Sequence, residues 1–309
     1  MTQKLPVRAI IGPTASGKTA LACEAYARGG IEIISMDSAL IYRGMDIGTA
    51  KPSKAEQAEF PHALIDIREP WELYSTADFI QDCTGEIDAI HQRGNVPLLV
   101  GGTMLYLRSL LEGLGDNLPA ADISIRQAIE KEAKNKGWAE LHAELASHDP
   151  QTAARLLPSD SQRISRALEV FRQTGVPLSV LHAEQSEFQS PYNWEIKALF
   201  PERDWLHGRI AKRLALMWTS GFLEEVVTLR ACREITKDLP SMKSVGYRQV
   251  WDYLDSPIQT ETLWKDTQDK ALYATRQLAK RQYTWIRSLR ERHAMSLIDT
   301  PKNVIVFDN

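Results

Sequence analysis

The sequence has few cysteines, and none at the spacings in which cysteines usually act together. Its 309 residues include only Cys23, Cys83 and Cys232, with no CxxC pair. Such distant thiols argue against a disulfide framework and against a cysteine-based zinc module. No apolar run approaches the length of a membrane span, and the N-terminal residues lack the apolar region of a signal peptide. We therefore expect a cytoplasmic protein with reduced thiols and no membrane partner.

The sequence also lacks an excess of positive charge. Its 37 Lys and Arg residues are matched by 40 Asp and Glu, for a net charge of −3. A nucleic acid would therefore have to bind a local basic patch, because the protein has no global positive field. The length allows one large domain or two modest ones, and a hydrophobic fraction of 43% is ordinary for a globular protein.

What the sequence does contain is a complete phosphate-binding loop. Residues 12–19 follow an apolar run and precede a helix-forming stretch, which is the context that this motif requires. Backbone N–H groups of the loop and of the helix N-terminus converge on a phosphate. Lys18 adds a positive charge, and the Thr19 hydroxyl is placed to bind Mg²⁺ between phosphate oxygens. The predicted phosphate-binding residues are Gly12, Pro13, Thr14, Ala15, Ser16, Gly17, Lys18 and Thr19.

Apolar segments alternate with helical stretches over the first third of the chain. The predicted strands are residues 7–11, 31–36, 63–67 and 96–100. This alternation is typical of a parallel sheet with helical crossovers. Residues 118–192 are mostly helical in pattern, and a further strand at 194–200 returns to the sheet. The sequence thus predicts an α/β fold with a P-loop NTPase-like parallel sheet core, built from residues 1–117 and 193–309, and a helical insertion domain at 118–192.

Polar residues follow two of these strands. Asp37 comes directly after the predicted strand at 31–36. The predicted strand at 96–100 is followed by Gly101, Gly102 and Thr103. Ligands bind outside the carboxyl ends of parallel strands, so Asp37 and Thr103 are expected in one cleft. Asp37 could hold Mg²⁺ through water, act as a general base, or simply cap the strand. The glycines permit close backbone approach to a ligand, although a tight turn without ligand contact is the alternative.

Basic residues gather on a long C-terminal helix predicted from about residue 261 to 292. Six Lys or Arg residues lie between positions 271 and 293, against one acid. Four residues share one face at i, i+4, i+7 and i+11: Arg276, Lys280, Tyr283 and Arg287. This basic stripe suits phosphate contact and base stacking. Arg163 and Arg166 form a smaller pair on another predicted helix, and in both places a plain solvated face is the alternative.

Together these segments resemble the tRNA dimethylallyltransferase family, bacterial prenyltransferases that act on the adenosine just 3′ of the anticodon. The resemblance runs from Gly12 to about Arg287. Its motifs lie, in order, at residues 12–19, 37–52, 101–103, 160–170, 244–249 and 275–285. A phosphate loop alone occurs in many NTPases, whereas this conjunction is specific. The chain departs from the family at Leu40, where glutamine is usual.

The resemblance implies a reaction and roles for particular residues. The phosphate loop would hold the diphosphate of dimethylallyl diphosphate, together with Mg²⁺ near Thr19. The N6 amine of the adenosine would attack carbon C1 of the donor and release diphosphate, in tRNAs that read codons beginning with U. Asp37 would be the general base and Thr103 would orient the amine. Arg213 would bind the diphosphate, with Arg209 as the fallback.

The resemblance also implies that the anticodon stem-loop is held by several segments, with the adenosine extruded into the core. The expected tRNA-binding residues are Asp37, Ser38, Ala39, Leu40, Thr103, Arg126, Gln162, Arg163, Ile164, Ser165, Arg166, Met242, Lys243, Ser244, Val245, Gly246, Tyr247, Arg248, Lys280, Arg281, Gln282 and Tyr283. We expect a monomer.

Three other functions share part of this pattern. A small-molecule kinase would share the ATP-binding P-loop and the sheet, but it would leave the basic helix unexplained. An enzyme that prenylates free adenine nucleotides would share the loop and Asp37 with a reduced tRNA clamp. An RNA-binding protein with a vestigial loop would not need to keep four intact residues: Lys18, Thr19, Asp37 and Thr103.

Overall fold

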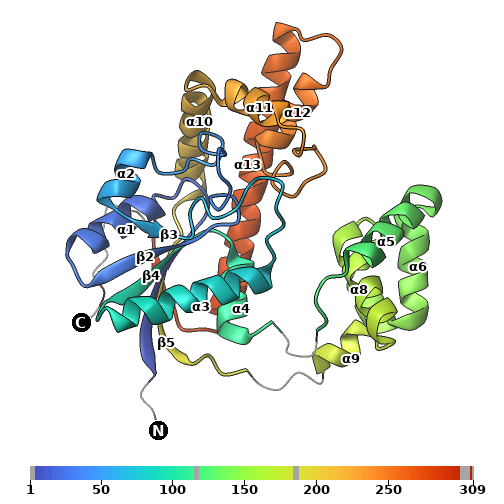
Figure 1. Cartoon of the computed structure of the whole chain (residues 1–309), viewed down its shortest axis with the longest axis horizontal. Helices are drawn as coiled ribbons and strands as arrows, with labels where there is room; N and C mark the ends of the chain where they lie inside the picture. The colour runs from blue at the N-terminus through green and yellow to red at the C-terminus, as the bar shows by residue number, and fades with distance from the viewer. Residues whose placement is uncertain (1–3, 115–117, 184–187, 300–306, 308–309) are drawn as a thin grey trace. The chain divides into compact units, whose positions relative to one another are not determined.

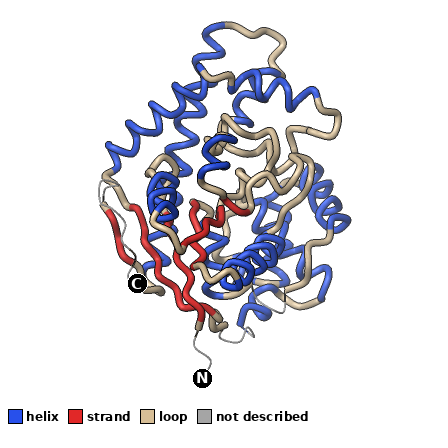
Figure 2. The backbone as a smooth tube through the Cα atoms, turned by 60° about the vertical axis from the view of Figure 1, so that its left-hand side comes forward, coloured by secondary structure: helices blue, strands red, loops and turns tan. Residues whose placement is uncertain are grey.

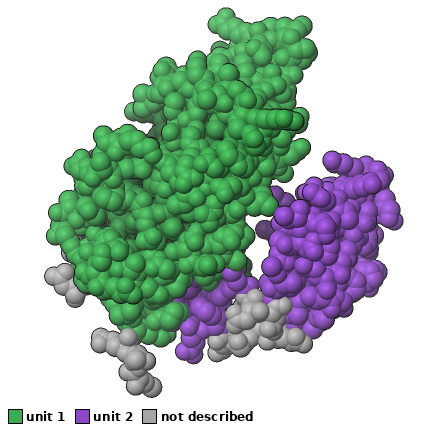
Figure 3. Space-filling model, in the orientation of Figure 1, with its two compact units in different colours: residues 1–109, 191–309 green, residues 110–190 purple. Residues whose placement is uncertain are grey.

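The computed structural model describes residues 4–114, 118–183, 188–299 and 307. The chain forms two compact units, coloured separately in Figure 3. The first joins Met1–Ser109 with Pro191–Asn309, and the second is Leu110–Ser190. The sequence placed the insertion at 118–192, whereas the second unit begins within a helix, α4, that spans Met104–Glu112.

The first unit is built on one six-stranded parallel sheet, visible as the red strands of Figure 2. The strand order is β3-β2-β4-β1-β5-β6. The bounds are β1 Leu5–Ile11, β2 Ile31–Met36, β3 His62–Ala63, β4 Val96–Gly101, β5 Tyr192–Leu199 and β6 Ser296–Ile298. The predicted α/β fold with a P-loop-like parallel sheet is therefore confirmed.

The second halves of the central strands are largely apolar and buried, as expected where helices cover both faces of a sheet. Ile10 and Ile11 on β1 are both fully buried although they point to opposite faces. Helix α1 (Lys18–Ala27) packs on one face, where Leu21 and Ala25 join a core cluster with Ile10. Helix α3 (Thr76–Gln92) lies on the other side of the sheet (Figure 1). Ser75 begins α3 with a capping box.

The remaining helices of this unit follow β5 or connect the early strands. Their bounds are α2 Lys54–Glu59, α10 Arg203–Thr219, α11 Phe222–Ala231, α12 Tyr247–Leu254 and α13 Glu261–Arg290. A second core cluster joins α10, α11, α12 and α13 through residues such as Leu206, Phe222, Tyr247 and Ala279. Among the described residues, no helix combines the length and the hydropathy needed to cross a bilayer.

The second unit is entirely helical in its described part. Its helices are α5 Ile123–Lys136, α6 Trp138–His148, α7 Pro150–Ala153, α8 Ser161–Thr174 and α9 Leu178–Ala183. Ile129, Leu141 and Leu168 belong to its separate hydrophobic core. Asp149 caps α7 and also accepts a hydrogen bond from the Ser179 N–H at 2.9 Å, which ties α7 to α9.

One predicted strand is wrong. Residues 63–67 were expected to form a strand, but β3 ends at Ala63. Leu64 and Asp66 adopt positive φ angles of 65° and 57°, which an extended strand cannot contain. Helix α2 and the edge strand β6 were not predicted, although the capping box of Ser53 and Glu56 at the start of α2 is a sequence signature of a helix N-terminus.

Candidate active site

The phosphate loop connects β1 to α1 and has the backbone that its motif requires. Ala15 and Gly17 have φ angles of 63° and 97°, the left-handed conformation that turns successive N–H groups inward. The Ser16 N–H donates to the carbonyl of Pro13 at 3.2 Å and closes the turn. Thr19 is exposed in the first turn of α1. The loop is therefore shaped to bind an anion.

Three cationic side chains surround the loop. Lys18 Nζ donates to the carbonyl of Pro13 at 2.9 Å, and Arg209 Nε donates to that of Ala15 at 2.8 Å. Arg213 donates to the Thr14 hydroxyl at 2.5 Å. Burial lowers the pKa of Lys18 to about 8, an effect that Asp37 opposes and Arg213 reinforces. Burial also lowers the pKa of Arg213, again opposed by Asp37. A buried anion would relieve the repulsion among these cations.

Asp37 and Thr103 lie at the carboxyl ends of the adjacent strands β2 and β4, as the sequence predicted. Asp37 Oδ1 accepts a hydrogen bond from the Ala39 N–H at 2.9 Å, which leaves its second oxygen for other partners. The Thr103 hydroxyl accepts from the Ser38 N–H at 3.0 Å. A Cβ on Gly101 would lie 1.9 Å from the carbonyl oxygen of Met36, so only glycine allows this close approach of the two strands.

A cavity of about 440 Å³ opens beside these groups. Three polar or charged residues line it: Thr14 of the phosphate loop, Asp37 and Arg213. Apolar side chains complete the lining: Met104, Leu105, Leu214, Met217, Phe222, Leu278 and Trp285. A pocket with a charged end and apolar walls can hold the phosphate of a ligand and enclose an uncharged portion.

Gln282 braces the charged end of this cavity. Its Oε1 accepts a hydrogen bond from the Thr14 N–H at 2.8 Å, and its Nε2 donates to the carbonyl of Gly102 at 3.0 Å. The side chain is 8% exposed. The sequence assigned Gln282 to tRNA binding, but both ends of its amide link the phosphate loop to the glycine turn. A glutamine on a helix carries no signal for this role.

The cavity brings together half of the residues expected to bind tRNA. These are Asp37, Ser38, Ala39, Thr103, Lys243, Ser244, Val245, Gly246, Tyr247, Arg281 and Gln282. Leu40 and Arg248 lie outside its lining. Met242 is fully buried, as is Ile164 in the second unit, so neither side chain is exposed for contact with RNA.

The expected tRNA-binding residues of the second unit divide into two groups. Arg126 and Arg166 lie 2.9 Å and 3.1 Å from Oε2 of the buried Glu169, so they neutralise a charge of their own unit. The Arg166 guanidinium also donates to the carbonyl of Pro119 at 2.7 Å. Gln162 and Arg163 are exposed, and Ser165 is half-buried. Arg163 is therefore the better placed cation for an outside partner.

The basic stripe of the C-terminal helix does not face the cavity. Arg276, Lys280, Tyr283 and Arg287 line a separate pocket of about 350 Å³, together with Arg203 and His207. At 100° per residue they lie on the face of α13 opposite to the cavity-lining residues Thr275, Leu278, Gln282 and Trp285. Tyr283 donates to the carbonyl of Pro201 at 2.5 Å, and its ring packs edge-on against Phe200.

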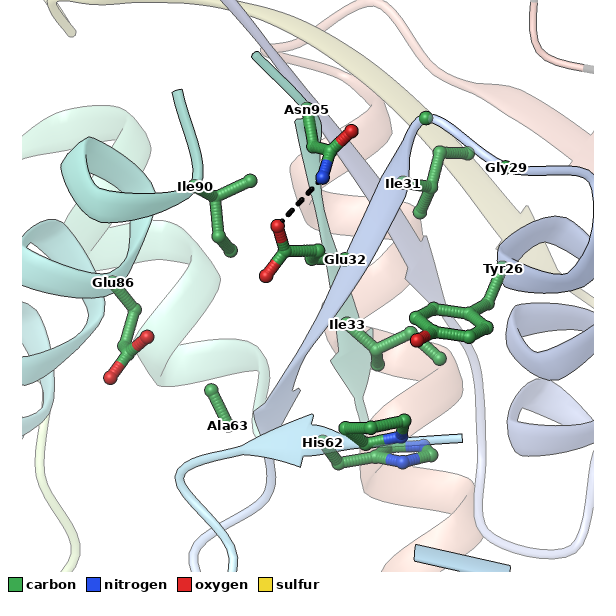
Figure 4. Close-up of a pocket in the computed structure, with 12 residues that line it drawn as sticks. Tyr26, Gly29, Ile31, Glu32, Ile33, His62, Ala63, Glu86, Ile90 and Asn95 are labelled. Carbon is green, nitrogen blue, oxygen red and sulfur yellow. Dashed lines mark hydrogen bonds between the residues drawn. The ribbon is translucent and has the colours of Figure 1, made fainter. Parts of the chain in front are cut away.

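A larger pocket of about 590 Å³ lies at the opposite end of the sheet (Figure 4). The pocket lies at the start of β2, and Tyr26 and His62 are among its lining residues. Within it, the Asn95 side chain donates a hydrogen bond to the Glu32 carboxylate at 2.8 Å. The Glu32 carboxylate is already paired with Arg93 at 2.6 Å. Ligands of parallel α/β sheets bind at the carboxyl ends of the strands, so we assign the function to the smaller cavity.

A metal ion would find one protein ligand at the phosphate loop. Within the described residues, no group of three or more His, Cys, Asp or Glu side chains could hold a metal ion. The exposed Thr19 hydroxyl is a hard oxygen donor beside a phosphate-shaped loop. This fits Mg²⁺, which commonly takes one or two protein oxygens, substrate phosphates and water.

Comparisons with known proteins agree with one another. A family model described as IPP transferase matches residues 40–289. A tRNA dimethylallyltransferase of Acinetobacter baumannii is 53% identical over 295 residues, which cover 95% of this chain and 94% of the relative. Among solved structures, the tRNA isopentenylpyrophosphate transferase of Bacillus halodurans has a TM-score of 0.67 and 36% identity, with 96% of this chain and 90% of that one covered. A eukaryotic dimethylallyltransferase acting on tRNA has a TM-score of 0.79 and 25% identity, with 96% and 74% covered.

Proposed function

This chain belongs to the IPP transferase family, and on that premise we propose that it transfers a dimethylallyl group from dimethylallyl diphosphate to tRNA. The acceptor is N6 of the adenosine 3′ of the anticodon, in tRNAs reading codons that begin with U, and diphosphate is released. The observation that carries this proposal is a single cavity that joins Thr14 and Arg213 to Asp37 and to the segment 243–247.

The phosphate loop binds the donor and stabilises its leaving group. As the bond between C1 and oxygen breaks, negative charge develops on the diphosphate. Lys18 and Arg213 are held beside the loop in a buried site, where a cation stabilises that charge more than it would in water. By analogy with oxyanion holes, each donor that is well placed lowers the barrier by roughly 3–4 kcal/mol.

Asp37 accepts the proton that N6 loses as the new C–N bond forms. The hydrogen bond from the Ala39 N–H holds the carboxylate in place at the carboxyl end of β2. Thr103, bonded to Ser38, orients the amine from the end of β4. A general base in this position contributes roughly 10²–10⁴ to the rate.

The adenosine reaches Asp37 by leaving the stack of the anticodon loop. The apolar walls of the cavity, including Phe222 and Trp285, can contact its base and the prenyl group. Lys243 and Arg281 are exposed residues that line the cavity, and they suit contact with the phosphates of the RNA. Arg163 of the second unit, which is exposed, is a further contact.

Mg²⁺ would be held by Thr19 and by oxygens of the donor diphosphate, and when bound it neutralises part of the diphosphate charge. The protein works as a cytoplasmic monomer, because tRNA is a cytoplasmic substrate and one chain supplies every group in the mechanism.

The test is an incubation of the protein with labelled dimethylallyl diphosphate, Mg²⁺ and unmodified tRNA, followed by nucleoside analysis. We expect label on N6 of the one adenosine, and far less label in the same time with Asp37→Ala. Phosphate transfer from ATP without any prenyl donor would show a kinase instead. Faster labelling of free AMP than of tRNA would show an enzyme that prenylates nucleotides.

A further inference from the structure

A carboxylate outside the cavity holds part of the cavity wall in place. Glu225 on α11 accepts four hydrogen bonds, three from successive backbone amides and one from a phenol. The donors are Asp46 N (2.9 Å), Ile47 N (2.6 Å), Gly48 N (3.1 Å) and Tyr247 Oη (2.6 Å). Gly48 and Tyr247 both line the cavity, whereas Glu225 does not. Glu225 therefore connects two wall segments that lie 199 residues apart in the chain.

These contacts require a negative charge rather than a neutral amide. Three consecutive N–H groups of this turn bind the two oxygens of one carboxylate, Asp46 and Ile47 at Oε2 and Gly48 at Oε1, as in an anion-binding nest. The Tyr247 side chain is fully buried, and burial, followed by the charge of Glu225, raises the pKa of its phenol. Tyr247 thus remains a hydrogen-bond donor at neutral pH, and all four partners of the Glu225 carboxylate are donors.

The packing around Gly48 leaves no room for a side chain. A Cβ at Gly48 would lie 2.1 Å from the ring of Phe222 and 2.7 Å from that of Tyr247. Phe222 precedes Glu225 by three residues, so both side chains project from one face of α11. The helix thus packs against the Cα of Gly48 and binds its amide at the same time.

A second charge holds the other side of the segment. The Lys51 side chain is 1% exposed, and its ammonium donates to the carbonyl of Tyr42 at 2.6 Å, to Asp46 at 2.7 Å and to Asp66 at 2.6 Å. Thr49, which also lines the cavity, donates from its hydroxyl to the carbonyl of Met45 at 2.6 Å. Lys51 thus holds Tyr42, Asp46 and Asp66 together, whereas the amides of Ile47 and Gly48 are bound by Glu225.

We propose that Glu225 is a positioning residue for the acceptor base, which fixes the wall made by Gly48, Thr49 and Tyr247. The inference rests on the proposed function and deepens it. The donor is anchored through its charged diphosphate at the phosphate loop, and none of the partners of Glu225 belongs to that loop. The uncharged base depends on the shape of the wall, whereas the donor keeps its diphosphate anchor, so a displaced wall weakens the binding of tRNA far more than that of the donor.

The test compares Glu225→Gln with Glu224→Gln. Glutamine has nearly the same shape, but it offers one oxygen in place of two and turns an NH₂ group toward donors. Glu224 is the matched control, because it is the exposed neighbour on the same helix. We expect Glu225→Gln to raise the KM for tRNA about tenfold, the factor for one lost charge-assisted hydrogen bond. The Kd of the donor should stay within about twofold, and Glu224→Gln should change neither.

Two further measurements separate positioning from a general structural role. Amide hydrogen exchange at residues 46–48 should speed up in Glu225→Gln while exchange in the phosphate loop is unchanged. Tyr247→Phe removes one of the four donors and should raise the KM for tRNA by a smaller factor, non-additively with Glu225→Gln. Tyr247→Phe also serves as the test if Glu225→Gln fails to fold.

Equal KM values for Glu225→Gln and Glu224→Gln would overturn the inference. So would a parallel loss of donor affinity and thermal stability, because it would show that Glu225 supports the fold as a whole. A wild-type protein that transfers no prenyl group to tRNA would instead refute the proposed function, and exchange at residues 46–48 would still report on Glu225.

Discussion

Replacing Gln282 by methionine distinguishes two roles of this residue: holding the phosphate loop in place, or contacting the tRNA. Methionine has nearly the volume of glutamine, so the packing around this buried side chain should be largely kept. The variant removes the acceptor of the Thr14 N–H and the donor to the Gly102 carbonyl. Each backbone group left buried without a partner costs about 1–3 kcal/mol. Because the loop can relax partly toward water, we expect the free energy of unfolding to fall by about 2–4 kcal/mol.

The functional consequence should fall on the donor. Thr14 lies between the Gln282 brace and the Arg213 guanidinium, so its displacement moves a diphosphate-binding group. We expect the Kd of dimethylallyl diphosphate, measured by titration calorimetry, to rise about tenfold or more, which corresponds to at least 1.4 kcal/mol. The Kd of tRNA measured without donor should change little. Gln277→Met is the matched control, since Gln277 is exposed on the same helix.

The opposite pattern would refute the reasoning. If Gln282→Met bound the donor normally but lost affinity for tRNA, Gln282 would contact the RNA, as its sequence motif suggested. If unfolding were as difficult as in the wild type, the two hydrogen bonds would contribute nothing measurable to the phosphate loop.

Four other predictions concern the charged groups. Asp37→Asn should bind both substrates and lose about 10²–10⁴ in single-turnover rate, and a rate within threefold of wild type would remove Asp37 as the base. Only the cationic form of Lys18 binds the diphosphate, so the affinity for the donor should be highest below the Lys18 pKa of about 8 and fall about tenfold per pH unit above it. Lys18→Arg should abolish this pH dependence, because arginine stays charged. Replacing Arg163 and Arg281 together by glutamine should flatten the salt dependence of tRNA binding by about one to two in slope, and an unchanged slope would mean that the RNA lies elsewhere. Chelation of Mg²⁺ should stop turnover, and added Mg²⁺ should restore it; full activity in the chelator would exclude the metal.

The sequence alone determined the parts of the site that depend on local structure. A strand, a glycine loop and a helix follow one another directly, so the phosphate loop could be predicted from its sequence motif. Asp37 and Thr103 could be placed in one cleft because the carboxyl ends of parallel strands lie at one edge of the sheet. The strand predicted at 63–67 failed because Leu64 adopts a positive φ angle that its side chain does not foretell, and Asp66, a residue type that tolerates this conformation, adopts one too.

Tertiary structure alone decided which side chains serve which partner. Helical periodicity separates the faces of α13, but it does not say that Gln282 faces the phosphate loop or that Lys280 faces away from it. Glu225 and Gly48 are far apart in the sequence, and no local pattern marks the carboxylate that binds the amide. The physical reason is that strand, loop and helix arise from neighbouring residues, whereas a hydrogen bond across the fold exists only once packing has brought its two ends together.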